Sequence, residues 1–197
     1  MKKHHLILLL PTIALLLKGC KDKTEYCPCY PQEKTDYMPV NFAGKTMRYI
    51  LDDDTLTLKV IPPVFSEEYT KDSDKAIHDM GICNAQATLC LISDDTTRIL
   101  TYRAYNYADS DTYHLSVNFH DMVNGIHTAA YVEDIYHNAQ NAVPLSQWTS
   151  PTGQTYTDVL KAMLHQTETD TDTSYLSKTH GLLHCYTYNG HTLTFLP

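Results

Sequence analysis

The chain has 197 residues, 43% of them hydrophobic, and a formal net charge of −8 at pH 7. This length suits a single domain with a sizeable core. The acidic balance argues against nucleic acid or an anionic surface as partner, because both bind basic patches.

The first twenty residues have the features of an export signal. Two lysines precede the apolar run Leu6–Leu17, and a Lys-Gly-Cys sequence ending at Cys20 closes it. A run of about twelve residues is shorter than the roughly twenty that a membrane-spanning helix needs, which favours cleavage over a retained anchor. The segment resembles a bacterial lipoprotein signal, in which Leu17 and Gly19 flank the cut and Cys20 receives the lipid. The alternative is a secretory signal with a coincidental cysteine.

The lipoprotein resemblance also implies an address. In Gram-negative lipoproteins the residue after the lipidated cysteine helps to sort the protein, and Asp there would favour the inner membrane. Here that residue is Lys21. We therefore expect a protein anchored by its N-terminal lipid in the outer membrane, on the periplasmic face or at the cell surface. Two or three acyl chains would hold it there, whereas one binds only marginally.

Residues 20–44 follow the signal peptide 1–19 and mix charge, proline and tyrosine without periodicity, as expected of a lipidated tether. A single β-rich domain is expected over residues 45–197. Five cysteines other than Cys20 would lie in an oxidising compartment, so at least one is unpaired. They are Cys27, Cys29, Cys83, Cys90 and Cys185. Two structural pairings stay open, Cys83 with Cys90 or the Cys27-Pro28-Cys29 pair with the domain.

After the tether the pattern changes to short alternating runs separated by turn residues, which is typical of an antiparallel β protein. Met47–Leu51 and Leu56–Val60, separated by three aspartates, predict a hairpin. Further strands are predicted at Ala87–Ile92, Thr97–Tyr107 and Tyr113–Val123.

Two Asn-Gly dipeptides predict tight hairpins, because both positions of a type I′ turn need positive φ. The first, Asn124-Gly125, would pair Val123 with Ile126, Phe119 with Ala130 and Val117 with Val132. The second, Asn189-Gly190, would pair Tyr186 with Leu193 and Leu183 with Leu196.

About nine strands result, with Tyr156–Met163 assigned to a strand on its Tyr, Val and neighbouring Thr residues. Their hairpin succession predicts a mainly β fold, an antiparallel meander forming a sandwich or open barrel. One or two short helices are expected, at residues 73–80 and 133–142.

The last 45 residues or so contain one distinctive series of motifs: GQTYTDV at 153–159, Tyr175, Gly-Leu-Leu at 181–183, and Asn-Gly followed by Thr192, Leu193 and Leu196. This pattern is similar to the C-terminal region of small bacterial lipoproteins of uncharacterised function. The resemblance implies β-strands ending in a hairpin and transfers no catalytic residue.

Local signatures of catalysis and cofactor binding are missing from the sequence. It has no G-x-S-x-G elbow, no phosphate-binding glycine loop and no H-E-x-x-H. His180 and His184 would lie about 13 Å apart on a strand, and His191 about as far from His184, whereas zinc ligands lie about 2 Å from one ion. We therefore expect no metal site and no cofactor. The acidic clusters at 52–54, 109–111 and 168–172 lack the calcium-loop pattern and are expected to be solvated turns.

Fifteen tyrosines and a single Trp148 give one positive indication. Exposed aromatic side chains on a rigid β scaffold can stack on sugars or anchor a protein partner. Tyr102, Tyr105 and Tyr107 share one predicted strand. The favoured interpretation is a non-enzymatic binding or accessory module for a partner protein or a glycan, with no identified ligand residues. The alternative is an envelope hydrolase with scattered active-site residues.

From the lipoprotein-like signal we predict that Cys20→Ala abolishes lipid attachment and membrane association. Fractionation of cells that express the intact chain or the variant, with globomycin treatment and protease shaving, measures both effects. Unchanged processing and location in the variant would refute the lipoprotein interpretation.

Overall fold

The structure, a computed structural model, describes residues 30–71, 81–107, 112–133, 135, 141–167, 170–186 and 190–197. These residues form β-strands and two lone turns of 3-10 helix, Gln32–Lys34 and Val40–Phe42. The mainly β, antiparallel class predicted from the sequence is confirmed. The expected helix at 73–80 lies outside the described residues. Most of the expected helix at 133–142 does too, and its last residue already belongs to a strand.

Twelve strands lie within the described residues and form one sheet. They are β1 (Thr46–Leu51), β2 (Asp54–Val60), β3 (Val64–Lys71), β4 (Gly81–Ile92), β5 (Arg98–Tyr107), β6 (Tyr113–Asp121), β7 (Ile126–Val132), β8 (Ala142–Thr149), β9 (Thr155–Thr167), β10 (Asp170–Ser177), β11 (Gly181–Tyr186) and β12 (Thr192–Leu196). The order is β7-β6-β5-β4-β2-β1-β12-β11-β10-β9-β8, with β3 beside β4.

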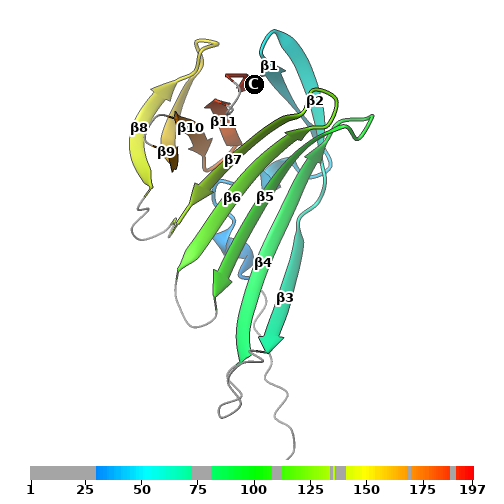
Figure 1. Cartoon of the computed structure of the whole chain (residues 1–197), viewed down its shortest axis with the longest axis vertical. Coiled ribbons are helices and arrows are strands. Elements are labelled where there is room, and N and C mark those ends of the chain that lie inside the picture. Colours follow the sequence, from blue (N-terminus) through cyan, green and yellow to red (C-terminus); the bar gives the residue numbers. More distant parts are fainter. Residues whose placement is uncertain are drawn as a thin grey trace, which may run out of the picture.

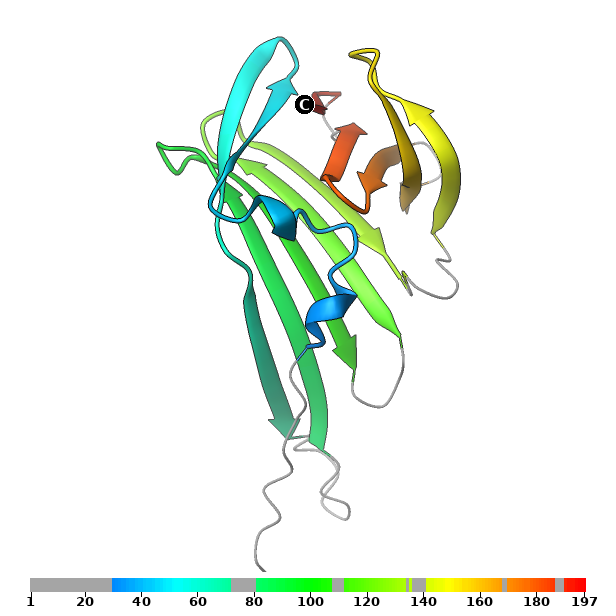
Figure 2. The ribbon, with the colours of Figure 1, turned by 180° about the vertical axis from the view of Figure 1, so that it is seen from behind.

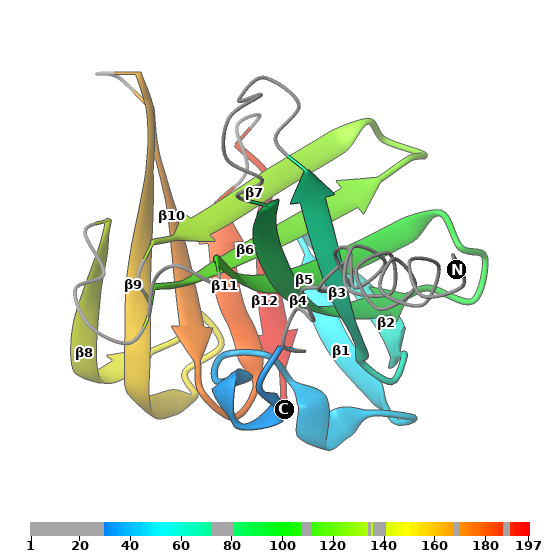
Figure 3. The same cartoon turned by 90° about the horizontal axis from the view of Figure 1, so that it is seen from below.

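The sheet folds back on itself into a nearly closed barrel. Strands β4–β7 (Figure 1) cross the arc formed by β8–β12, β1 and β2, as the view from below shows (Figure 3). Near the two ends of the sheet, β7 packs against β9. The barrel therefore has two layers of one continuous sheet, and the apolar side chains of both layers form a single core.

Three strands are absent from the nine that the sequence predicts: β3, β8 and β10. Strand β3 follows the Pro62-Pro63 pair, β8 contains Pro144, and β10 begins with an acidic, threonine-rich run. Each of these features is typical of a loop in a single sequence. The strands form because neighbours pair with them, β3 with β4 and β8 and β10 with β9.

The predicted hairpin of β1 and β2 is confirmed, with Leu51 opposite Asp54. Its turn is tied to the end of the chain by Asp52, whose carboxylate accepts the Thr192 N–H at 2.9 Å and contacts His191 Nδ1 at 2.7 Å. The hydrogen bond from the Thr192 amide, with a further contribution from His191, lowers the pKa of this carboxyl against the opposing effect of burial. The turn is therefore part of the contact between β1 and β12.

The predicted register of the first Asn-Gly hairpin is wrong by two residues. Asp121 pairs with Ile126 and Phe119 with Thr128, so the loop has four residues, 122–125. Gly125 has φ +65°, but Asn124 does not have the positive φ that a type I′ turn needs. A shift of two residues preserves the faces of a strand, so Phe119 still faces the core.

The physical cause of the longer loop is the carboxylate of Asp121. It accepts hydrogen bonds from the backbone N–H of Val123 at 2.9 Å and of Asn124 at 3.1 Å. It also accepts one from the Asn124 side-chain amide at 2.9 Å and one from Arg98 Nε at 3.0 Å. Burial favours the neutral acid, but these hydrogen bonds outweigh it and hold the pKa of Asp121 below its ordinary value.

The second Asn-Gly hairpin is also misregistered. Cys185 pairs with Leu193 and Tyr186 with Thr192, not Tyr186 with Leu193. This one-residue shift changes which side chains share a face. Cys185 and Leu193 are both buried, and Tyr186 is left 47% exposed.

Residues 30–44, which the sequence analysis assigned to the tether and which are here called the strap, pack against the barrel. Tyr30 and Met38 are almost completely buried. The Tyr30 ring meets that of Tyr113 on β6 at 5.9 Å, edge to face. The strap crosses the side of the sheet that β10–β12 leave uncovered (Figure 2). The packed part of the chain therefore includes Tyr30.

The strap, β5 and β11 meet at Gly181. A Cβ at this position would lie 2.7 Å from Tyr102 Oη and 2.8 Å from Pro39 Cδ, and its φ is +69°. The Leu182 N–H donates a hydrogen bond to the Tyr102 hydroxyl at 2.8 Å. Only glycine gives the backbone this conformation without a clash.

We predict that Gly181→Ala destabilises the fold far more than Gly153→Ala. Gly153 also has positive φ, +85°, but a Cβ there would meet nothing within 4 Å. Both variants incur backbone strain of about 1–2 kcal/mol, and Gly181→Ala adds an overpacking cost of about 1–3 kcal/mol. Urea unfolding measures the difference, and equal losses in the two variants would contradict the prediction.

We also predict that Asp121→Asn lowers the free energy of unfolding by about 2 kcal/mol at pH 7, because charge-assisted hydrogen bonds are lost. A lowered folded-state pKa contributes stability above the ordinary Asp pKa of about 4, and that contribution is lost as pH falls through the folded-state value. The difference between wild type and variant should therefore narrow below about pH 4. Asp94→Asn, in an exposed turn, is the control. A pH-independent difference would contradict the assignment.

Candidate functional site: an aromatic platform beside an edge strand

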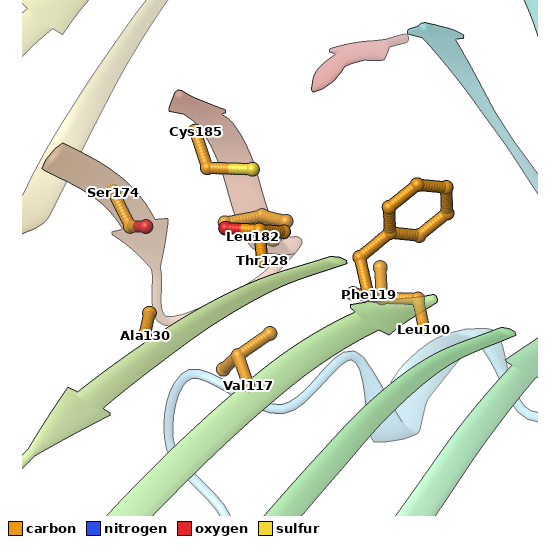
Figure 4. A pocket seen from close by; sticks show the side chains of 8 residues that line it. All are labelled: Leu100, Val117, Phe119, Thr128, Ala130, Ser174, Leu182 and Cys185. Atoms are coloured by element: carbon orange, nitrogen blue, oxygen red, sulfur yellow. The ribbon is translucent and has the colours of Figure 1, made fainter. Parts of the chain in front are cut away.

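The core between the two layers is filled by side chains. Leu100, Val117, Phe119, Thr128 and Ala130 from one layer face Ser174, Leu182 and Cys185 from the other (Figure 4). The gaps between them leave no room for a water molecule. Ser174 Oγ is buried there without a hydrogen-bond partner. This part of the core is therefore packing and not a ligand cavity.

The structure does not pair Cys83 with Cys90, one of the two disulfides that the sequence leaves open. Both residues lie on β4, seven positions apart, and a strand rises about 3.3 Å per residue. A disulfide needs Cα atoms within about 7 Å. Cys90 forms no disulfide, and its sulfur lies 3.9 Å from Thr101 Oγ1; Cys185, which is buried in the core, forms no disulfide either. Cys20, Cys27 and Cys29 lie outside the described residues.

Four aromatic side chains from three strands form a cluster that reaches the surface, here called the aromatic platform: Trp148 (β8), Tyr175 (β10), the buried His184 and the exposed Tyr186 (both β11). Trp148 stacks on Tyr175 with ring centroids 4.3 Å apart and planes 17° apart. His184 lies 6.0 Å from Trp148 and meets Tyr186 edge to face at 4.7 Å. Trp148 and Tyr175 are half-buried, and Tyr186 is the most exposed member.

The platform is continuous with a buried row of rings. Tyr156 stacks beside Trp148 at 6.4 Å and contacts His180 and Phe195. His180 in turn contacts Phe42 of the strap at 5.7 Å. Because each ring rests on the next, the platform is held by the core and not by a loop.

His184 is the polar member of the platform. Its Nδ1 shares a hydrogen bond of 2.8 Å with the Thr194 hydroxyl, and its Nε2 is buried without a partner. Burial lowers the pKa of the imidazole. A neutral ring that packs among aromatics is the state this environment favours.

The three histidines weighed as metal ligands lie in separate environments. His180 packs on Phe42 and Phe195, His184 belongs to the platform, and His191 contacts Asp52. Across the described ranges, no group of three His, Cys, Asp or Glu side chains could hold a metal ion. Of the acidic clusters, 52–54 forms the β1–β2 turn, whereas Asp109, Asp111 and Glu168 lie outside the described residues.

Two of the three tyrosines that the sequence placed on one strand, Tyr102 and Tyr105, lie in different surroundings. Tyr102 is buried between the layers. Tyr105 stacks on His114 at 4.9 Å and shares a hydrogen bond of 3.2 Å with the Tyr131 hydroxyl. The side chain of Tyr107 lies outside what the structure describes. The rings of the platform instead come from strands that are distant in sequence. Of its members, Trp148 was singled out in the sequence analysis as the single tryptophan of the chain.

The platform adjoins the free edge of β8. Among the described strands, β8 pairs only with β9. Its sequence, AVPLSQWT, has no charged residue, and Val143 is 45% exposed. Proteins commonly protect exposed edges with charges, and β3, which pairs only with β4, carries Glu67, Glu68 and Lys71. An uncharged edge is a template for pairing with another strand.

No family model, curated protein or solved structure matches this chain. Within the described part of the chain, no helix is long and apolar enough to cross a membrane.

Proposed function

We propose that this protein is a lipid-anchored protein of the cell envelope whose β-rich domain is a non-enzymatic binding module for a partner protein. In the proposed arrangement, acylated Cys20 fixes the chain to the outer membrane. The barrel presents the edge of β8 and the aromatic platform to the partner.

The observation that carries the proposal is the uncharged free edge of β8 beside the stacked Trp148. A partner strand that pairs with an exposed edge gains affinity from main-chain hydrogen bonds and specificity from neighbouring side chains. Pro144 has no N–H to donate, which directs new pairing to residues 145–149. Trp148 lies within that segment and supplies the large half-exposed ring common at binding hot spots.

The proposal predicts that a charge on the edge of β8 abolishes partner binding. Gln147 and Thr157 are exposed cross-strand neighbours, but only Gln147 belongs to the edge strand. Gln147→Lys should lower binding at least about tenfold, equivalent to about 1.4 kcal/mol, because natural edges use lysine to prevent pairing. Thr157→Lys adds the same charge one strand further in and should bind as wild type.

The measurement is in-cell photo-crosslinking from position 146, with the adduct identified by mass spectrometry and quantified in both variants. A discrete adduct that Gln147→Lys removes and Thr157→Lys retains supports the proposal. Equal loss or equal retention would contradict a role for the edge.

The glycan alternative has its own readout. Trp148 is the only tryptophan of the chain, so its fluorescence reports on the platform alone. A saturable fluorescence change with soluble cell-wall glycan fragments that persists in Gln147→Lys would assign the platform to sugars and overturn the protein-partner proposal.

A further inference from the structure

A concave site lies at one mouth of the barrel, away from the strap. Its volume is about 200 Å³, and it is lined by Leu51, Asp54, Thr55, Leu56 and Arg98. The first four belong to the β1–β2 hairpin, and Arg98 begins β5; both elements reach the upper end of the molecule in Figure 1. The mouths of β-barrels are common places for small-ligand sites.

Two opposite charges line this pocket without meeting each other. Arg98 Nε is hydrogen-bonded to the buried carboxylate of Asp121 at 3.0 Å, which fixes the guanidinium. A guanidinium has five N–H donors, and apart from its contact with Asp121 the Arg98 guanidinium makes no hydrogen bond or ion pair to the described residues. The carboxylate of Asp54 has no ion-pair or hydrogen-bond partner among them either. The pocket therefore offers a donor group and an acceptor group held apart.

A ligand that bridges Arg98 and Asp54 needs a carboxylate near an ammonium group. The guanidinium fits a carboxylate through parallel N–H bonds, and the Asp54 carboxylate accepts from an ammonium. Leu51 and Leu56 supply the apolar part of the pocket wall. The volume is below the roughly 300–1,000 Å³ of pockets for drug-sized molecules, so the ligand is small.

We propose that the Arg98–Asp54 pocket binds a free α-amino acid with a small apolar side chain. The carboxylate of the ligand contacts Arg98, its ammonium contacts Asp54, and its side chain packs on the two leucines. This site is separate from the β8 edge and goes beyond the binding function proposed there.

Isothermal titration of the purified full chain with three probes tests the charge pattern. L-Leucine should bind saturably. N-Acetylleucine, which lacks the ammonium, and leucinamide, which lacks the carboxylate, should each bind at least tenfold more weakly, because each leaves one charged group unpaired. N-Acetylleucine binding as tightly as leucine would overturn the role of Asp54, and absence of saturable leucine binding would overturn the site.

Asp54→Asn and Asp53→Asn form a matched pair of variants in the same exposed turn. They remove the same charge, but only Asp54 lines the pocket. Asp54→Asn should weaken leucine binding at least tenfold and Asp53→Asn should leave it unchanged. Equal effects would refute the proposal. Arg98 is not substituted, because its loss would leave the buried Asp121 charge unpaired.

Gln147→Lys separates this proposal from the previous one. The variant alters the β8 edge and should leave leucine binding intact. Gln147→Lys should lose partner crosslinking and keep leucine binding. Asp54→Asn should keep crosslinking and lose leucine binding. Either result shows that the two proposals can be tested independently.

Discussion

The hydrogen bond from the Leu182 amide to the Tyr102 hydroxyl is the contact on which the barrel depends. It joins β5 to β11, two strands of opposite layers that are 80 residues apart in sequence, at a distance of 2.8 Å. The bond requires close approach, which the missing Cβ of Gly181 permits, and Pro39 of the strap closes over the same point. Sheet closure and strap packing are therefore parts of one constraint.

Closure of the barrel is incomplete, so the sheet keeps unpaired edges. A fully closed barrel has no free edge, but this sheet ends in β7 and β8 and carries β3 at its side. Strand β7 is covered by its packing on β9, and the sequence of β3 contains charged residues, which are typical of protected edges. Strand β8 has neither form of protection along its uncharged sequence. The contrast explains why the proposed interface lies there.

The buried carboxylate of Asp121 connects the turn after β6 with Arg98. Asp121 is fully buried, yet it accepts hydrogen bonds from Arg98 and from the turn that follows β6. A buried carboxylate is tolerated when its charge is paired and its oxygens are satisfied. Asp121 thereby sets the loop length and fixes Arg98 at the barrel mouth. One residue links the hairpin geometry to the proposed ligand pocket.

The sequence by itself determined the β class, the antiparallel succession of hairpins and the strand character of residues 156–163, because alternation and turn residues are local properties. It could not set the registers at Asn124-Gly125 and Asn189-Gly190. At the first of these, the hydrogen bonds of the buried Asp121 carboxylate outweighed the preference of the dipeptide. The aromatic platform could not be predicted from the sequence either, because its rings come from three different strands. Only the tertiary structure decided which aromatic residues meet and which edge stays free, because both depend on pairing between strands distant in sequence.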